Sequence, residues 1–312
     1  MAALALGAGL IGAATLGAQD AIETLPVKGQ VSMVAGAGGN VTVLDGPQGV
    51  LLVDAGRQGM SDALLAGVRR ITTRPIHFLL NTTGDMDHVG GNLEVGKAGR
   101  PAPGSNQAAS PNTPIYAHEN VLNRMSLGKG GDPMLEIGYW PTVTFFTAKR
   151  TLYFNNEPIE LIWQKAAHTD GDLLIFFRLS DVVSAGDVLN TTSFPVIDLT
   201  HGGSIQGEID ALNRIIDITV PRLNQMDGTR VIPGHGRICN EADVVEYRDM
   251  VTIIRDRVKT LADQGKSLED VVAARPAYEY EPLYGTDKAW TTRQFVEAVY
   301  RSLKPAERTS RQ

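Results

Sequence analysis

A polar stretch that follows a short apolar segment constrains this chain more than any other feature. The apolar segment, residues 76–80, ends at once in residues 81–92, where Asp85, Asp87 and His88 fall within four positions of one another. We interpret the apolar segment as a buried strand that delivers these side chains to the edge of a sheet. Carboxylates and imidazoles gathered there lose solvation unless a cation lies between them, so the stretch predicts a metal site. The alternative is a polar turn in which the aspartates bond their own backbone.

Composition narrows the functional classes. At 312 residues the chain can bury a large core, either as one sizeable domain with an appendage or as two modest domains. The formal net charge is -6 and no run of Lys and Arg stands out, so we expect no nucleic-acid partner. Cys239 is the single cysteine, which excludes a disulfide within the chain and a thiolate metal cluster. Histidines and carboxylates are therefore the strong metal ligands that remain.

The N-terminal segment predicts export. Residues 1–18 carry no charge and consist mostly of Ala, Leu and Gly, although the basic start of a secretory signal is missing. We expect a periplasmic or secreted protein, with an uncleaved membrane anchor or a buried N-terminal helix as alternatives. Contact with a membrane is expected only if the segment stays uncleaved. The domain prediction is a signal or anchor over residues 1–20, a folded domain over 25–240 and a helical extension over 241–312.

Strands and helices alternate in the middle of the chain. An apolar strand at 50–54, a helix that begins near Ser61 and the strand at 76–80 form a strand-helix-strand unit. Open α/β sheets place their sites where such strands end. Further strands are expected within 144–188 and at 229–232, helices at 204–220 and 244–262, and pocket walls from the loop 126–141 and the helices after Asn240.

Three further loops, each at the end of a predicted strand, carry residues of the same kind. They contribute His168, Asp187 and His235. Imidazole and carboxylate suit zinc, manganese or iron, and the missing thiolates argue against copper. Two neighbouring ions can share a bridging carboxylate, for which Asp187 is the natural choice. A metal with one open position lowers the pKa of bound water to roughly 7, which predicts a hydrolase that uses a metal-bound hydroxide.

Together and in this order, these loops resemble the metallo-β-lactamase fold superfamily. The resemblance covers about residues 30–239. It implies an α/β (α+β) fold, the αββα sandwich, in which two sheets lie face to face with helices outside and the metal site lies along one sheet edge. The segments that carry it are Gly-Asn-Val-Thr-Val-Leu (39–44), Val-Asp-Ala-Gly (53–56), Asp-His-Val-Gly-Gly-Asn (87–92), His-Thr-Asp-Gly-Asp (168–172), Gly-Asp (186–187) and Pro-Gly-His-Gly (233–236).

The ligand motif of that superfamily, His-x-His-x-Asp-His, is altered in this chain to Thr83-Gly84-Asp85-Met86-Asp87-His88. Position by position, the resemblance implies that the second metal site is complete, whereas the first keeps His168 and offers Thr83, a poor ligand, and Asp85. We therefore predict one firm Zn²⁺ and a weak or absent second ion. Some relatives with a carboxylate at the second His position hold a di-iron centre, so iron and manganese stay open. The complete site consists of Asp87, His88, His235 and the bridging Asp187.

Residues close to the ligands are predicted to support them. Asp87 is the catalytic candidate, because it can orient the attacking water as a general base if one metal binds. His201 is predicted to contact substrate. Asp54 is expected to bond backbone near the site, and Asp172 to order the His168 loop. Cys239 is expected to be a small buried hydrophobe.

Three functions stay open on the sequence. The first is an exported metal-dependent hydrolase of a small-molecule ester, lactone, thioester or amide, among which a β-lactam is only one. The second is an iron-dependent oxidoreductase of the same fold, supported by the oxygen-rich first site. The third is a non-catalytic binding protein with a decayed metal site, supported by the loss of both leading histidines. The identity of the metal separates the first two, and its absence selects the third; the oligomeric state is left open.

Overall fold

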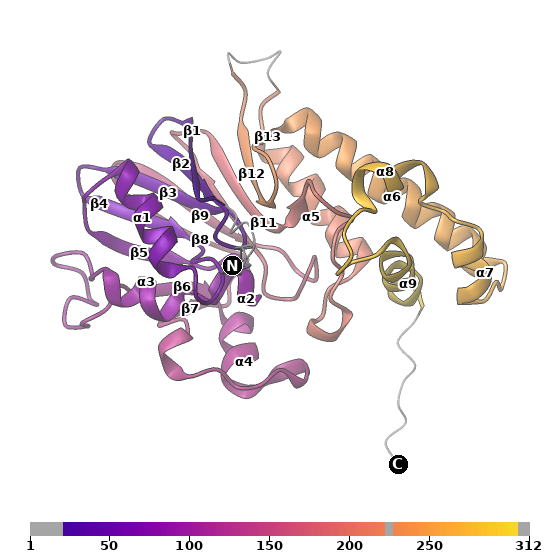
Figure 1. Ribbon diagram of the computed structural model, residues 1–312, viewed down its shortest axis with the longest axis horizontal. Helices are drawn as coiled ribbons and strands as arrows, with labels where there is room; N and C mark the ends of the chain where they lie inside the picture. Colours follow the sequence, from indigo (N-terminus) through magenta and orange to yellow (C-terminus); the bar gives the residue numbers. More distant parts are fainter. Residues whose placement is uncertain (1–20, 222–226, 305–312) are drawn as a thin grey trace, which may run out of the picture.

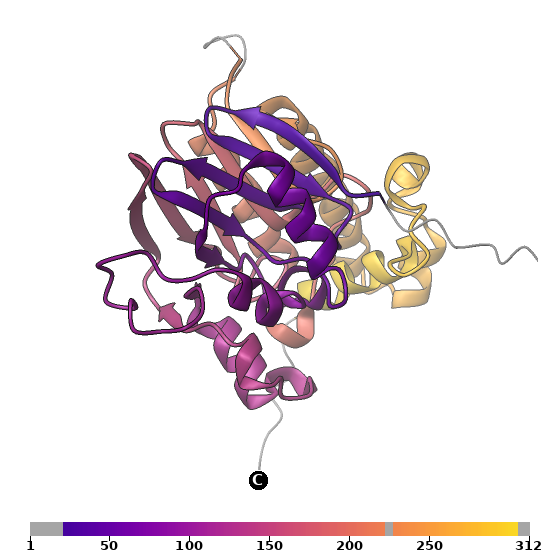
Figure 2. The ribbon, with the colours of Figure 1, turned by 60° about the vertical axis from the view of Figure 1, so that its left-hand side comes forward.

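The computed structural model of the chain describes residues 21–221 and 227–304. Two β-sheets lie face to face with helices on their outer sides (Figure 1). Figure 2 shows α1 (Ser61–Ile71) across the outer face of the first sheet, with the second sheet behind it. This confirms the sandwich predicted from the sequence. The expected export segment, residues 1–20, lies outside the described residues, and no helix among those described is both long and apolar enough to cross a membrane.

The first sheet carries the strand that leads into the metal-binding stretch. Its seven strands follow one another in sequence order, antiparallel from β1 to β4 and parallel from β4 to β7. Helix α1 connects β4 to β5, which is the strand-helix-strand unit predicted from the sequence. The strands are β1 (Glu23–Lys28), β2 (Val31–Ala35), β3 (Val41–Gly46), β4 (Gly49–Val53), β5 (Ile76–Leu80), β6 (Ile115–His118) and β7 (Val143–Phe145).

The second sheet has six strands and is antiparallel except at one pair. Strands β11 and β12 run parallel because α5 (Ile205–Ile218) connects them. The order across the sheet is β13-β12-β11-β10-β9-β8. The strands are β8 (Lys149–Phe154), β9 (Glu157–Trp163), β10 (Leu173–Phe177), β11 (Val182–Asn190), β12 (Arg230–His235) and β13 (Cys239–Asn240).

Alternation along the strands divides the apolar residues between separate cores. Leu44 and Leu51 face the second sheet, where they meet residues such as Leu161, whereas their neighbours Val43 and Leu52 face α1. Successive side chains of a strand point to opposite faces, so each strand of the first sheet supplies two cores at once. A third and larger core lies between the second sheet and the C-terminal helices.

The C-terminal helices cover the outer face of the second sheet. Helix α6 packs along α5, and α9 packs against both. The side chain of Asn240 caps α6 in a capping box with Asp243, and Thr291 caps α9 in the same way with Gln294. The boundaries of the predicted domains stay a prediction. The helices of this part are α6 (Glu241–Asp263), α7 (Leu268–Ala273), α8 (Glu281–Tyr284) and α9 (Thr292–Leu303).

Two elements near the site differ from the sequence prediction. The sequence predicts that Asp187 lies on a loop after the end of a strand, but β11 continues to Asn190. Gly186, with φ at 53°, allows the register shift that lets the strand run on. The stretch after β5 is also more ordered than a loop, because Asp87 and His88 belong to one helical turn, α2 (Met86–Val89).

Candidate metal centre

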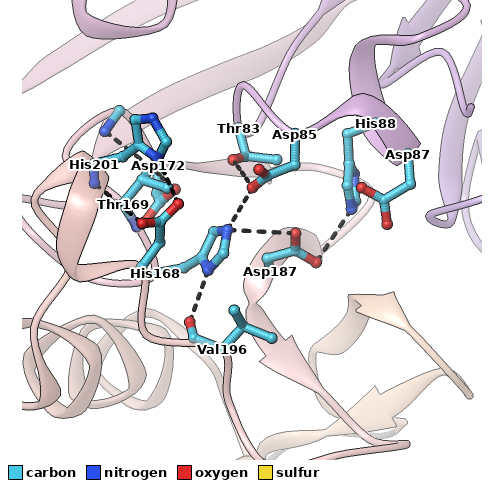
Figure 3. A network of polar contacts seen from close by, with 12 residues as sticks. Thr83, Asp85, Asp87, His88, His168, Thr169, Asp172, Asp187, Val196 and His201 are labelled. Carbon is cyan, nitrogen blue, oxygen red and sulfur yellow. Dashed lines mark hydrogen bonds and ion pairs between the residues drawn. The ribbon is translucent and has the colours of Figure 1, made fainter. Parts of the chain in front are cut away.

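The six ligands predicted from the sequence converge at one edge of the sandwich. They form two groups that share Asp187, and within each group the ligand atoms lie within 4.8 Å of one another. Figure 3 shows His88 and His168 directed toward the Asp187 carboxylate from opposite sides. The first group, which is the metal site predicted to be complete, consists of Asp87, His88, Asp187 and His235. The second group, which is the metal site predicted to be incomplete, consists of Asp85, His168 and Asp187.

The first group combines two carboxylates with two imidazoles. Asp187 Oδ1 lies 3.1 Å from His88 Nε2 and 3.5 Å from His235 Nε2. The Nε2 atom of His235 also lies 2.9 Å from Asp87 Oδ2. These four side chains come from α2, β11 and the end of β12, which are far apart in the sequence. The arrangement directs nitrogen and oxygen ligand atoms toward one small volume, as the site predicted to be complete requires.

The second group is arranged differently. Asp85 Oδ2 lies 2.5 Å from His168 Nε2 and accepts a hydrogen bond of 3.0 Å from Thr83 Oγ1. The other oxygen, Asp85 Oδ1, accepts a hydrogen bond of 2.9 Å from Arg124 Nη2. Asp187 contributes more weakly here, since its Oδ2 lies 3.8 Å from His168 Nε2. The first group therefore has four convergent ligands, and the second has three of which Asp85 is already bonded on both oxygens.

Hydrogen bonds behind the ligands orient two of the histidines. His168 Nδ1 lies 2.7 Å from the carbonyl oxygen of Val196, and a carbonyl can only accept, so Nδ1 is the donor. His88 Nδ1 likewise lies 2.8 Å from Asp54 Oδ2. In both rings the Nε2 atom therefore faces the site. Asp54 bonds backbone as predicted, through Thr82 N at 2.8 Å, and it also fixes the His88 ring.

Two glycines leave the room that the ligands occupy. A Cβ atom on Gly39 would lie 2.4 Å from His88 Cε1, and one on Gly234 would lie 2.4 Å from Asp187 Oδ1. Any other residue at these positions would push a ligand out of place. Both glycines belong to the segments that carry the family resemblance, and their role here is to let backbone approach the ligand side chains.

Charge at the site is out of balance without a cation. Burial opposes the charged form of His88, but the carboxylates of Asp187 and Asp54 outweigh it and raise the pKa of His88 well above its ordinary value. Burial also opposes the charge on His168, and Asp85 and Asp187 raise its pKa in the same way. Burial opposes ionisation of Asp187, yet the neighbouring His88 lowers the pKa of Asp187 below the usual range. Such a cluster takes up protons where a divalent ion would otherwise supply the positive charge.

A cavity of about 750 Å³ opens onto the ligands. Asp85, Asp87, His168, Asp187 and His235 are among the residues that line it. Its remaining wall is partly polar and partly apolar, and it comes from α4 (Glu119–Leu127) with the loop after it, from residues 190–198 and from the segment before α9. The loop at 126–141 lines the cavity as predicted, whereas the C-terminal part of the lining comes from a non-helical segment and not from the predicted helices. The apolar lining residues are Met86, Met125, Pro133, Leu135, Val196, Ala289 and Trp290.

The other predicted supporting residues lie near the site. The substrate contact predicted for His201 stays a prediction: His201 is buried, its Nδ1 lies 2.5 Å from Asp198 Oδ2 and its Nε2 lies 3.1 Å from the carbonyl oxygen of Lys129. Asp172 orders the His168 loop as expected, because it accepts a hydrogen bond of 2.7 Å from Thr169 N. Burial raises the pKa of Cys239 to about 12, as fits a buried thiol without a nucleophilic role.

Sequence reasoning missed Arg124, Asp132 and Trp290. Arg124 belongs to the ordinary amphipathic helix α4, and its pairing with Asp85 crosses 39 positions without any motif. Asp132, in the loop that follows, holds the other end of the guanidinium through Arg124 Nε at 2.7 Å. Trp290 lies in the segment before α9, and only an aromatic residue in a loop could have drawn attention to it.

Comparisons with known proteins agree with this fold. Residues 34–235 match the family model described as the metallo-beta-lactamase superfamily. No curated protein matches the chain. Among solved structures, the stereoselective inverting sec-alkylsulfatase Pisa1 from Pseudomonas sp. is similar with a TM-score of 0.63 and 14% identity, over 92% of this chain and 51% of that one. A metallo-beta-lactamase from Pontibacter korlensis is similar with a TM-score of 0.56 and 14% identity, over 74% of this chain and 99% of that one.

These identities relate the folds alone. The chain spans about half the length of the alkylsulfatase that it matches. It nevertheless matches that structure over most of its own length, whereas the β-lactamase covers a smaller share.

Proposed function

Because the chain belongs to the metallo-beta-lactamase superfamily, as the family match over residues 34–235 shows, we propose that it is a metal-dependent hydrolase of a small-molecule ester-type substrate. The observation that carries the proposal is the convergence of Asp87, His88, Asp187 and His235 on one volume at the floor of a cavity. A site decayed to simple turns has no reason to keep four ligands within 4.8 Å of one another.

The donor set fits a divalent ion. Two carboxylates and two imidazoles suit zinc, manganese or iron, and we propose zinc as the resident ion. The two glycines that make room for His88 and Asp187 support the fit, as does the deficit of positive charge around these side chains. An ion held there supplies Lewis-acid chemistry, by making a water acidic and by polarising the substrate oxygen.

The chain's own residues define the open side of the site. The side chains of His88 and Asp187 are 0% and 13% exposed, whereas those of His235 and Asp87 are 29% and 41% exposed. Substrate and water therefore approach from the side of Asp87 and His235, which also line the cavity. If His88, Asp187 and His235 hold the ion, Asp87 can orient the attacking water and accept its proton.

The cavity wall favours a substrate with an apolar part. Leu135, Val196 and Trp290 line the wall beside the ligands, and each offers apolar surface to an alkyl or aryl substituent. We propose carboxylic esters, lactones, thioesters or amides as the substrate class. Secondary alkyl sulfates are worth the same test, because an alkylsulfatase is among the similar structures.

The test is metal reconstitution followed by a substrate screen. Protein loaded with zinc, manganese or iron is expected to hydrolyse at least one ester-type substrate, and Asp87→Asn is expected to lose about 10²-fold or more of that activity. Asp263→Asn is the matched control, since that side chain is 65% exposed and pairs with Lys259 on α6. Iron bound with redox activity and no hydrolysis would turn the assignment toward an oxidoreductase. No bound metal after reconstitution would overturn both enzyme functions in favour of a binding protein.

A further inference from the structure

Arg124 holds a charged position directly beside the second ligand group. Its guanidinium donates from Nη2 to Asp85 Oδ1 at 2.9 Å and from Nε to Asp132 Oδ2 at 2.7 Å. The side chain is 14% exposed and lies against Gly84, where a Cβ atom would come within 3.2 Å of Arg124 Cδ. The guanidinium is thus fixed from two sides, and the ligand motif itself leaves space for it.

The contacts of Asp85 leave it little capacity to bind an ion. One oxygen accepts from Arg124, and the other accepts from Thr83 and faces His168 Nε2. Asp87 differs, because among the described residues its carboxylate forms an ion pair with His235 alone, and its side chain is 41% exposed. A metal ion can therefore bind Asp87 by replacing one contact, whereas at Asp85 it would have to replace the contacts with Arg124, Thr83 and His168.

The charge of Arg124 acts against a cation in the second group. A guanidinium stays protonated at any pH that a protein tolerates, so Arg124 cannot lose its charge when a metal ion approaches. A divalent ion between Asp85 and His168 would lie next to this fixed positive charge, and Thr83 would offer it no nitrogen ligand. The guanidinium of Arg124 therefore serves as the cationic partner of Asp85.

We infer that Arg124 takes the place of a second metal ion, so that this site binds one ion tightly and keeps the Asp85 and His168 side closed. This inference rests on the proposed function for the presence of the first ion, and it adds what limits the number of ions. Arg124 is here a positioning residue, which acts through Asp85. Asp132 serves the same end, because it ties the guanidinium to the loop after α4, where Asp132 Oδ2 also lies 3.4 Å from His201 Nε2.

The experiment counts bound ions. Metal-free protein is titrated with Co²⁺, followed by its visible absorption and by elemental analysis after gel filtration. The wild-type chain is expected to bind one ion tightly and a second at least about 100-fold more weakly. Arg124→Gln removes the charge and is expected to bring the second affinity within about tenfold of the first. Arg124→Lys keeps the charge and is the matched control, expected to bind one ion as the wild type does.

The outcomes separate this inference from the proposed function. Two tightly bound ions in the wild type would overturn the inference and leave the hydrolase proposal standing, and this result needs no variant to fold. One tightly bound ion in Arg124→Gln, with a native circular dichroism spectrum, would also overturn it. No ion in the wild type would overturn the proposed function and the inference with it. A second ion that appears in Arg124→Gln but not in Arg124→Lys is the supporting result.

Discussion

His88 Nδ1 and Asp54 Oδ2 lie 2.8 Å apart, and the two side chains are 0% and 2% exposed. The remaining oxygen of Asp54 accepts from Thr82 N at 2.8 Å, and Oδ2 also accepts from Thr82 Oγ1 at 2.7 Å. Asp54 has φ at 68°, a left-handed conformation that Asp and Asn tolerate better than most residues. The backbone conformation of Asp54 at the end of β4 therefore helps to determine the direction in which His88 presents Nε2.

Replacing Asp54 by Asn is expected to weaken metal binding about 10- to 100-fold. Asn keeps the left-handed backbone and can still accept from Thr82 N, but its amide group offers His88 Nδ1 a donor in place of an acceptor. The ring then tends to carry its proton on Nε2, where the metal should bind. Calorimetric titration of metal-free protein with zinc measures the effect, with Asp45→Asn on the surface of β3 as the control. Equal affinity in both variants would contradict the role given to Asp54.

Replacing Gly39 by Ala is expected to abolish tight metal binding. The new Cβ would lie 2.4 Å from His88 Cε1 and 2.5 Å from Nε2, so the imidazole must move. Gly96→Ala is the control, because its Cβ would meet nothing closer than Ile115 Cδ1 at 3.9 Å and it lies inside α3 (Asn92–Ala98). Elemental analysis of both variants after reconstitution decides the matter. Full metal content in folded Gly39→Ala would show that the ring has another position in which it can bind.

The metal-free protein is expected to lose stability as the pH rises above about 6.5. Burial disfavours the charged His88 and His168, but neighbouring carboxylates raise the pKa of both well above their ordinary value of 6.5. Their protonation therefore stabilises the fold fully below pH 6.5, and this contribution is lost as the pH rises through the folded-state pKa values. The slope is up to about 1.4 kcal/mol per pH unit for each proton.

Asp172 adds a further loss of stability, which occurs at lower pH than the loss due to the two histidines. Burial raises its pKa from 3.8 to about 7, so its protonated form also favours the fold, and that contribution declines between these two values. Urea unfolding of chelated protein from pH 5 to 9 measures the sum. The same series with zinc bound is the control, because the single ion replaces the proton of His88 and removes the part of the decline that comes from His88. Stability that stays level above pH 6.5 in the chelated protein would contradict the assignment.

The sequence predicted those parts of the molecule that depend on local pattern. The apolar run before Asn81 became β5, and the ligands that follow it reached the sheet edge, because a buried strand fixes where its end lies. Strand β1 was missed, since residues 23–28 contain Pro26 and have no buried residue. The position of Asp187 within β11 is not predicted, because a glycine such as Gly186 occurs both where strands end and where a strand is irregular.

Long-range pairings were beyond sequence reasoning. Arg124 meets Asp85 only because α4 packs beside the end of β6 and the loop after α4 returns Asp132 to the guanidinium. No spacing in the chain encodes these contacts. The family motif predicted that the second group is incomplete, but it could not predict that an arginine fills the gap.

Replacing Trp290 by Ala is expected to raise KM about tenfold or more and to leave the metal content unchanged. Trp290 lines the same cavity as the ligands and is held by a hydrogen bond of 3.1 Å from its Nε1 to the carbonyl oxygen of Pro195. Its ring therefore offers a substrate apolar surface without touching the ion, and truncation loses substrate contact but not a ligand. Trp290→Phe keeps an apolar ring but loses the hydrogen bond. Its KM is therefore expected to lie between that of the wild type and that of Trp290→Ala. A loss of metal in Trp290→Ala would instead tie this segment to the metal centre, and an unchanged KM would place the substrate elsewhere in the cavity.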